Sequence, residues 1–338
     1  MSLLILLPLI GILSFFLTAG LRLYALRRSL LDIPNTRSSH SVPTPRGGGV
    51  AIVVSFSIAL VVMYAGGELS TDAFGALAGA GLFVAGLGFL DDHGHVPARW
   101  RLLGHFLAAA WAMAWFGGAP AIYFGGVSID GVVVNLLMVF YLVWLLNLYN
   151  FMDGIDGIAS IEAISVCVGA ILMYWLSGAS GAIAPLLLLA VAVGGFLYWN
   201  FPPARIFMGD AGSGFLGITL GVFSLQAAWV QSSLFWGWII LLGVFVVDAT
   251  VTLIRRMLLG ERVHEAHRSH AYQYASRRYG KHLPITIAVT AINLFWLAPL
   301  ALVVAMGKLD GGGGVLIAYL PLLLIALKFN AGKPEQRV

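Results

Sequence analysis

Residues 147–160, NLYNFMDGIDGIAS, carry polar side chains inside an otherwise apolar stretch. Two asparagines and two aspartates recur there every three residues: Asn147, Asn150, Asp153 and Asp156. An α-helix turns every 3.6 residues, so one continuous helix would point the first and the last of them in different directions. A glycine follows each aspartate and tolerates unusual backbone angles, which lets a helix end and a loop gather the four groups. The pattern predicts a polar pocket, and side chains that merely cap the next helix are the simpler alternative.

Two adjacent aspartates stand in the stretch FLDDHGHVPARWRLLGH, residues 89–105. Asp91 and Asp92 lie at the expected end of one helix, and Arg99 and Arg101 at the expected start of the next. Like charges side by side shift the proton affinity of a carboxylate, which suits a base or a metal ligand. A solvated helix end is the alternative.

A single carboxylate, Asp210, marks the stretch NFPPARIFMGDAGSGFLG, residues 200–217. A proline pair ends the preceding helix, and Asp210 stands at the expected start of the following one. The small residues after it serve either close helix packing or phosphate binding by free backbone amides. Because Mg²⁺ is held by one or two carboxylates together with substrate phosphate oxygens, Asp210 is the predicted metal ligand.

Histidines and arginines alternate in RRMLLGERVHEAHRSHAYQ, residues 255–273. His264, His267 and His270 recur every three residues, a spacing that zinc sites also show, but neighbouring arginines would repel a cation. Guanidinium groups pair bidentately with phosphate oxygens, and an imidazole donates a further bond. The loop therefore predicts a phosphate-binding group at His267, Arg268 and His270, with attraction to anionic lipid as the alternative.

The segments between these motifs are those of a membrane protein. Of the 338 residues, 60% are apolar and only 10% are charged, and the mean hydropathy is +0.92. The single cysteine lies in an apolar run, which excludes a disulfide framework and a thiolate metal site. Apolar stretches of about 20 residues predict an all-α, polytopic bundle of about 11 transmembrane helices forming one domain, residues 1–338. The eleven stretches begin near Leu3, Gly47, Thr71, Leu102, Val132, Ile155, Ala182, Gly212, Leu234, Leu283 and Gly314.

Basic residues predict the orientation of this bundle. With eleven helices, all of the 19 Lys and Arg residues except Lys308 fall in the connections of one side or in the C-terminal tail. Basic loops stay in the cytoplasm, so the N-terminus is expected to be periplasmic and the C-terminus cytoplasmic. The four motifs and all 8 histidines then share the cytoplasmic side, where a phosphorylated lipid and a water-soluble phosphorylated donor can meet.

Taken in order, the motifs resemble the polyprenyl-phosphate N-acetylhexosamine-1-phosphate transferases of glycosyltransferase family 4. The resemblance runs from LLDIPNTRSSHSVPTPRGGG, residues 30–49, through FLDD, NLYNFMDGIDG and FMGDAGS to HRSHAYQ. It implies transfer of a UDP-linked N-acetylated sugar phosphate to undecaprenyl phosphate, with release of UMP and Mg²⁺ as cofactor. It also implies a multi-pass protein of the bacterial cytoplasmic membrane whose active site faces the cytoplasm.

The resemblance assigns a role to each motif by matching positions. Asp210 corresponds to the Mg²⁺ ligand, and Asp91 and Asp92 to a catalytic pair near the lipid phosphate. The nucleotide pocket corresponds to Asn147, Asn150, Asp153 and Asp156. His267, Arg268 and His270 correspond to the diphosphate-binding loop, where Arg268 is also expected to act in catalysis.

The HRSH sequence indicates the branch within this family. With Arg268 and Ser269 between two histidines, it resembles enzymes that initiate O-antigen or related surface glycans more than the peptidoglycan translocases. That branch implies a role in lipopolysaccharide synthesis and donors carrying GlcNAc, FucNAc or QuiNAc. Which of Asp91 and Asp92 acts as a base, and whether the protein forms a homodimer, stay open. No nucleic-acid partner is expected.

Two other classes place acids in a helix bundle. A secondary transporter would hold its site near the bilayer midplane on broken helices within related halves, whereas here the polar groups gather at one edge and no repeat is visible. A non-catalytic scaffold would leave the carboxylates without a metal. Deeper in the apolar stretches stand Glu162 and Asp248, and Asp248 precedes Arg255 by two helical turns, which predicts a structural ion pair.

Overall fold

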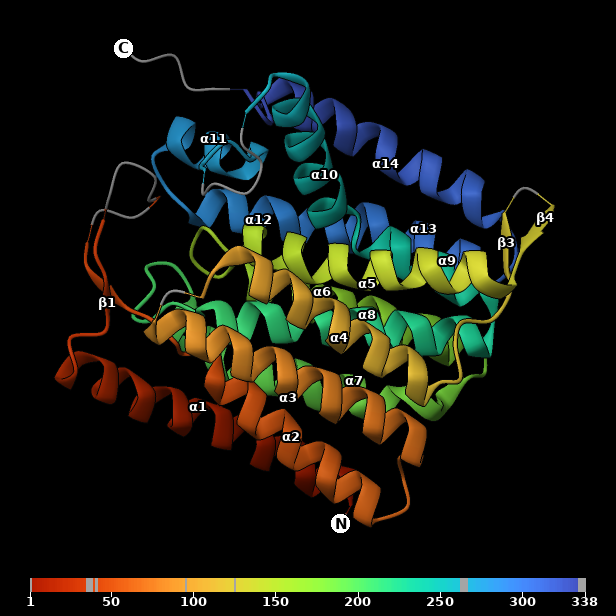
Figure 1. The fold of residues 1–338 in the computed structure, drawn as a ribbon, viewed down its shortest axis with the longest axis horizontal. Helices are drawn as coiled ribbons and strands as arrows, with labels where there is room; N and C mark the ends of the chain where they lie inside the picture. The colour runs from red at the N-terminus through yellow and green to blue at the C-terminus, as the bar shows by residue number, and fades with distance from the viewer. Residues whose placement is uncertain are drawn as a thin grey trace.

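The structure, a computed structural model, describes residues 2–34, 39, 42–94, 96–124, 126–261 and 267–333. Most of its helices lie alongside one another in a slanted bundle (Figure 1). The α-helices are α1 (Leu3–Arg27), α2 (Val50–Ala65), α3 (Thr71–His93), α4 (Ala98–Trp115), α5 (Gly131–Met152), α6 (Ile158–Leu176), α7 (Ile183–Asn200), α8 (Asp210–Val230), α9 (Ser232–Leu241), α10 (Gly243–Leu258), α11 (Ala271–Tyr279), α12 (Leu283–Ile292), α13 (Ala298–Ala305) and α14 (Gly311–Lys328). A short 3₁₀ turn, Ser180–Ala182, precedes α7, and a π-helical turn, Asn293–Leu297, joins α12 to α13.

The all-α, polytopic membrane class predicted from the sequence is confirmed. Among the described residues, eight helices are long and apolar enough to cross a membrane, and nine if the bent pair α9 and α10 counts as one span. Each of the eleven predicted stretches is helical, but α2 has only 16 residues and α4 begins with two arginines. The count of eleven spans and the orientation therefore stay predictions.

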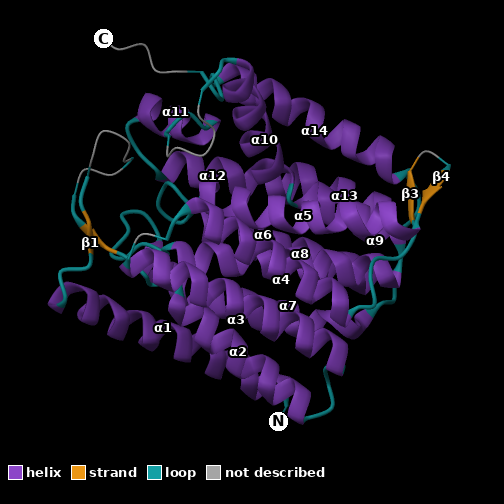
Figure 2. Ribbon diagram, in the orientation of Figure 1, coloured by secondary structure: helices purple, strands orange, loops and turns teal. Residues whose placement is uncertain are grey.

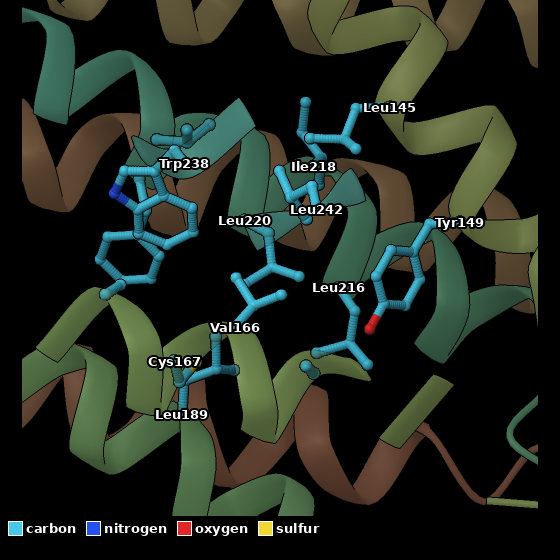
Figure 3. Packing of buried hydrophobic residues seen from close by; sticks show 14 of the residues in the cluster. Leu145, Tyr149, Val166, Cys167, Leu189, Leu216, Ile218, Leu220, Trp238 and Leu242 are labelled. Carbon is cyan, nitrogen blue, oxygen red and sulfur yellow. The ribbon is translucent and has the colours of Figure 1, made fainter. Parts of the chain in front are cut away.

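Helix α8 is the central element of the bundle. It packs against α3, α5 and α9. Of its most apolar 18-residue stretch, 83% is buried inside the protein. Side chains of α8 such as Leu216 and Leu220 meet Tyr149 of α5 and Val166 of α6 in one continuous apolar core (Figure 3). A helix that is apolar on all sides is the kind that a bundle encloses.

Small residues allow the other helices to approach the start of α8 closely. A Cβ atom built on Gly212 would lie 2.6 Å from the Cα of Gly49, at the beginning of α2. A Cβ atom on Gly88 of α3 would lie 2.5 Å from the backbone oxygen of Asp210. Both distances are too short for any side chain, so glycine is required where α2 and α3 meet α8. Close packing, the first alternative for the small residues after Asp210, is what the structure shows.

Two short antiparallel ladders mark opposite ends of the bundle (Figure 2). Strands β1 (Leu31–Asp32) and β2 (Thr44–Pro45) pair at the end where α1 finishes. Strands β3 (Ile122–Phe124) and β4 (Val127–Ile129) form a hairpin at the other end, between α4 and α5. Helices α3, α5 and α7 end on the β1 side and α8 begins there, so all the polar motifs gather at one end (Figure 1).

The last third of the chain departs from this regular packing. Helices α9 and α10 meet at an angle of 67°, and α10 stands across the others (Figure 1). This turn brings the end of α10 and helix α11 beside the β1 end of the bundle. The loop that carries Arg268 leads directly into α11, whereas Lys308 and Asp130 precede α14 and α5 at the opposite end.

The positions of these three residues allow a test of the predicted orientation. In a Cys167→Ala background, cysteines introduced at Lys308 and at Asp130 should react with a membrane-impermeant maleimide applied from the periplasmic side. A cysteine at Arg268 should react only after the cytoplasmic side is exposed, because basic loops remain inside. Labelling of position 268 from the periplasmic side in intact cells would contradict the orientation.

Candidate active site

A cavity of about 370 Å³ lies at the β1 end of the bundle and brings together residues from all four motifs. Its lining includes six of the residues predicted from the sequence: Asp92, Asn150, Asp153, Asp156, Asp210 and His267. The helices that deliver them are α3, α5 and α8, and the loops that follow α5 and α10 complete the wall. We call this space the acidic cavity.

Asp92 fixes the start of α8. Its Oδ1 accepts the backbone N–H of Asp210 at 3.2 Å, and its Oδ2 accepts that of Ala211, also at 3.2 Å. The first amides of a helix have no partner inside the helix, and they carry its positive dipole end. Asp92 supplies both the hydrogen bonds and the negative charge, so these amides are not open to a phosphate. Phosphate binding by the amides of the small residues after Asp210, the second alternative for the motif, stays a prediction.

Asp210 extends from this capped helix end into the cavity. Its side chain is 33% exposed, and its Oδ2 lies 3.4 Å from Nη1 of Arg101 on α4. The same Nη1 atom lies 2.5 Å from Oδ2 of Asp91, whose Oδ1 accepts the N–H of Val96 at 2.8 Å. Arg101 thus links Asp91 to Asp210, and Asp91 lies behind the cavity wall with both oxygens engaged by protein groups.

Negative charge accumulates around Asp153, the first residue after α5. Burial and the nearby charges of Asp210, Asp92 and Asp156 raise the pKa of Asp153 to about 7. A cation in the cavity would offset this repulsion. Over the described residues, however, no three carboxylate, imidazole or thiolate groups converge as a complete metal site. Any metal held here would need ligands from a substrate, as Mg²⁺ bound to phosphate oxygens has.

The loop between α5 and α6 turns its aspartates toward the cavity, as the spacing predicted. Helix α5 ends at Met152, and Gly157 adopts a left-handed conformation with φ of 74° before α6 begins. Asn200, at the end of α7, accepts the N–H of Gly157 at 3.1 Å and donates to the carbonyl of Ile206 at 3.0 Å. Asn200 therefore ties this loop to the segment that leads into Asp210.

Asp156 is held by the protein on both of its oxygens. Oδ2 accepts the N–H of Ala204 at 3.0 Å, and Oδ1 lies 3.1 Å from Nδ1 of His282, just before α12. Nε2 of His282 lies 3.0 Å from the carbonyl of Ser39. Burial alone would lower the pKa of His282, but the hydrogen bond and charge of Asp156 and the Ser39 carbonyl outweigh it and raise this pKa above 6.5. Asp156 thus clamps α12 to the cavity wall.

A second, more basic cavity of about 670 Å³ adjoins the first, and we call it the basic cavity. The two share Ser39, Asp156, Phe207 and His282 in their walls. The basic cavity adds the cationic side chains Arg268, Arg277 and Lys281. A ligand could span both spaces. Its anionic groups would lie near guanidinium groups in the basic cavity, and near any metal that the carboxylates hold in the acidic cavity.

His267 lies in the acidic cavity as a neutral imidazole. Burial, followed by the charges of His270 and Arg256, lowers the pKa of His267 to about 3 against the opposing effect of Asp248. Its Nδ1 lies 3.0 Å from Oγ and 3.4 Å from the backbone nitrogen of Ser269. Because Ser269 N–H donates to Nδ1, the ring proton lies on Nε2, where it can be donated to a phosphate oxygen.

Besides Asp91, two predicted site residues, Asn147 and His270, lie outside both cavities. Asn147 is on α5, one turn before Asn150, and its Nδ2 donates to the carbonyl of Val143 at 2.7 Å. His270 is the N-cap residue of α11 and is only 2% exposed, with its ring stacked 5.6 Å from that of Tyr272. The structure gives His270 a capping position, whereas its predicted role in phosphate binding stays untested. The loop residue His264 lies outside the described residues.

The ion pair predicted between Asp248 and Arg255 is wrong. Asp248 accepts the N–H groups of Ala271 and Tyr272 at 2.9 and 3.0 Å, so it caps α11 as Asp92 caps α8. Arg255 instead donates to the carbonyl of Ala331 at 3.2 Å. Spacing along one helix could not reveal this arrangement, because the partner amides come from the next helix in the chain.

Several cavity residues were missed by the sequence reasoning. Arg46, which donates to the backbone oxygen of Asp92 at 2.6 Å, belongs to the PTPRGGG stretch. Asn200 and Phe207 belong to the stretch around Asp210, but only its carboxylate was singled out. Phe207 lines both cavities. His282 gave no signal beyond its place on the predicted cytoplasmic side.

A multi-pass bundle with clustered carboxylates beside a basic cavity suits the binding of anionic ligands at a membrane surface. The profile of glycosyl transferase family 4 matches residues 73–228, which carry the Asp91–Asp92, Asp153–Asp156 and Asp210 motifs. This match, which covers a little under half of the chain, and the relatives below confirm the resemblance to glycosyl transferase family 4 that the motifs carry.

The chain is similar to three curated relatives with different names. The chain is 29% identical over 295 residues to the undecaprenyl-phosphate alpha-N-acetylglucosaminyl 1-phosphate transferase of Thermotoga maritima, covering 86% of this chain and 88% of the relative. It is 29% identical over 263 residues to the probable undecaprenyl-phosphate N-acetylglucosaminyl 1-phosphate transferase of Bacillus subtilis, covering 73% and 70%. It is 26% identical over 272 residues to the phospho-N-acetylmuramoyl-pentapeptide-transferase of Streptococcus thermophilus, covering 74% and 72%.

The pair formed by Asp156 and His282 predicts a pH-dependent stability. Because the pKa of His282 is raised on folding, its contribution is fully present below about pH 6.5 and is lost as the pH rises through the higher folded value. The melting temperature of wild-type protein in detergent should exceed that of His282→Gln most at about pH 6, and the difference should shrink towards about pH 8.5. An Asp156→Asn background should abolish this pH dependence. A difference that is constant over the range would show that His282 acts by packing alone.

Proposed function

We propose that this chain transfers an N-acetylated sugar-1-phosphate from a UDP-linked donor to undecaprenyl phosphate and releases UMP. The observation that carries the proposal is the acidic cavity, with Asp210 and Asp153 in its wall, directly beside the basic cavity with Arg268. A nucleoside diphosphate sugar needs both environments, a metal-binding carboxylate group and cations for its phosphate oxygens. The names of the relatives, all written for polyprenyl-phosphate or peptidoglycan-precursor transfer, support the same chemistry.

The reaction exchanges one phosphoanhydride bond for another. An oxygen of the lipid phosphate attacks the β-phosphorus of the donor and forms a new P–O bond. The bond from that phosphorus to the bridging oxygen breaks, and its electron pair leaves with UMP. A phosphate monoester has a second pKa near 6 and is largely ionised at neutral pH, so no strong base is required. Asp91 fits this picture, because Arg101 and the Val96 amide already engage its carboxylate.

The residues present fit a bound Mg²⁺. Asp210 is partly exposed in the cavity, and Asp153 lies among carboxylates whose repulsion a cation would relieve. The incomplete ligand set among the described residues suits an ion that shares its coordination with a diphosphate. When bound, Mg²⁺ would withdraw charge from the diphosphate oxygens and make UMP a better leaving group.

Different side chains of the protein would then contact different parts of the substrate. Arg268 would neutralise charge on the transferred phosphoryl group, and neutral His267 would donate a hydrogen bond from Nε2. Phe207 would stack on the uracil ring where the two cavities meet. Asp156 would act by holding the wall that the nucleotide contacts, since both of its oxygens already have protein partners.

The biological setting forms part of the same proposal. The cavities face the cytoplasm, where UDP-sugars are made, and the protein resides in the bacterial cytoplasmic membrane. The HRSH sequence supports initiation of O-antigen or a related surface glycan. The donor sugar is of the GlcNAc, FucNAc or QuiNAc type, and the relatives named for N-acetylglucosaminyl transfer make UDP-GlcNAc the first donor to test.

The proposal is tested by following UMP release from purified protein supplied with undecaprenyl phosphate, Mg²⁺ and a panel of UDP-sugars. UMP should appear only when lipid phosphate and an N-acetylated donor are both present. Glucose without the N-acetyl group, as UDP-glucose, is the matched control donor. If no donor in the panel releases UMP while the protein is folded and inserted, the proposed function is wrong.

Asp210→Asn should abolish transfer, because the neutral amide removes the exposed charge that holds the metal. The backbone N–H of residue 210 still donates to Asp92, so the helix start and the melting temperature should be preserved. UMP release and thermal unfolding are measured on the same preparation. Turnover that stays at the wild-type level under limiting Mg²⁺ would show that Asp210 does not hold the metal.

Arg268→Ala should lower kcat far more than it raises the donor KM. Loss of a group that stabilises charge in the transition state typically costs about 2–4 kcal/mol, a fall of roughly 30-fold to 1000-fold. Arg268→Lys should recover only part of this, because an ammonium group lacks the bidentate fork. Arg278→Ala, an exposed arginine at the end of α11, is the matched control and should keep wild-type kinetics. If Arg268→Ala changes only KM, the residue binds the nucleotide and is not catalytic.

A further inference from the structure

A buried carboxyl group lies within the membrane-spanning helices, away from both cavities. Glu162 is in the second turn of α6 and is 0% exposed, and Asn293, the first residue of the π-helical turn, is 2% exposed. Nδ2 of Asn293 donates to Oε2 of Glu162 at 2.6 Å. Such groups are rare inside a bilayer and need full hydrogen bonding or a counter-charge.

The two remaining oxygens of this pair lack a donor. Within the described residues, Oε1 of Glu162 and Oδ1 of Asn293 are both buried without a hydrogen-bond partner. An ionised carboxylate and an amide oxygen can only accept, so as an anion Glu162 would leave both atoms unsatisfied. One proton on Oε1 would remove the deficit, because a protonated carboxyl group donates while the amide oxygen accepts.

The groups that face Glu162 from the packed helices cannot supply that donor or a counter-charge. Among the described residues, Tyr149 of α5 and Tyr319 of α14 interact electrostatically with Glu162. The hydroxyl of Tyr149 donates to the carbonyl of Ala159, and that of Tyr319 to the carbonyl of Ile239, each at 2.6 Å. Among the residues that the structure describes, no Lys, Arg or His forms an ion pair with Glu162.

We propose that Glu162 is a proton-binding site, and that its protonated carboxyl group and the carboxamide of Asn293 form a closed pair of two hydrogen bonds. In this pair the O–H at Oε1 donates to Oδ1 of Asn293, and Nδ2 donates to Oε2. The π-helical turn begins at Asn293, where extra backbone width accommodates a side chain turned toward α6. The proton thus completes a link between α6 and the long helix that contains α12.

This link supports the wall of the acidic cavity from behind. Two turns before Asn293, Thr286 of α12 donates to the backbone oxygen of Asp156 at 2.9 Å, and His282 contacts the Asp156 carboxylate. The segment 156–162 is therefore joined at both of its ends to the long helix that contains α12. Loss of the proton would leave a buried, unpaired anion at one end and loosen the attachment at the other. The inference concerns the folded chain itself and does not depend on the proposed function.

Infrared difference spectroscopy of the full-length protein in lipid nanodiscs tests the protonation directly. Subtracting the spectrum of Glu162→Gln from that of wild type at neutral pH should reveal the carbonyl band of an un-ionised carboxylic acid, shifted down in D₂O. Glu68→Gln, which alters an exposed glutamate in the loop after α2, is the matched control and should reveal carboxylate bands only. Carboxylate bands in the Glu162 difference spectrum would overturn the proposal.

Thermal unfolding supplies an independent readout. Glu162→Gln keeps one donor and one acceptor in place, so its melting temperature should match that of wild type at neutral pH. Asn293→Leu removes the partner and should lower the melting temperature by several degrees. If Glu162→Gln destabilises the protein as strongly as Asn293→Leu does, the carboxyl group is needed as an anion and the proposal is wrong.

Discussion

The hydrogen bonds from the first amides of α8 to the carboxylate of Asp92 are the constraint on which the site depends. They join the end of α3 to the start of the most enclosed helix and satisfy amides that have no partner within the helix. Because Asp92 takes these amides, the neighbouring carboxylate of Asp210 is left to face the cavity. Two aspartates from distant motifs thus have complementary tasks, one structural and one directed at the ligand. Asp248 caps α11 in the same way and holds the loop carrying His267 and Arg268 against the cavity.

The sequence was sufficient for the features that depend on local physics. Apolar runs of bilayer length predicted each helical stretch, since a chain in lipid must satisfy its backbone internally. The three-residue spacing from Asn147 to Asp156 predicted that α5 ends and a loop follows, and Gly157 makes the left-handed turn that this requires. One-sided placement of charge predicted that the motifs share an end of the bundle, which the β1 side does bring together.

Features that depend on contacts between distant segments could not be predicted. Asp91 and Asp92 look equivalent in the sequence, yet Asp91 is held behind the wall by Arg101 whereas Asp92 caps α8. His270 and His267 look equally suited to bind phosphate, but one begins a helix and the other lines the cavity. In each case the residue type indicates that the side chain needs a polar partner. Only the packing decides whether that partner is a ligand or a group of the protein.

The carboxyl groups described above follow one rule: each is paired with the protein, aimed at a cavity, or, as proposed for Glu162, neutralised. The capping carboxylates illustrate the first outcome and Asp210 the second, and a protonated Glu162 would be the third. The rule explains why the acidic cavity can hold several carboxylates at the edge of a membrane. Some of them are satisfied by amides, by Arg101 and by His282, so part of the negative charge is already compensated, and Asp153 and the partly exposed Asp210 still face the cavity. The protein thereby keeps a small excess of negative charge in the cavity. A cation can bind there and take its remaining ligands from phosphate groups.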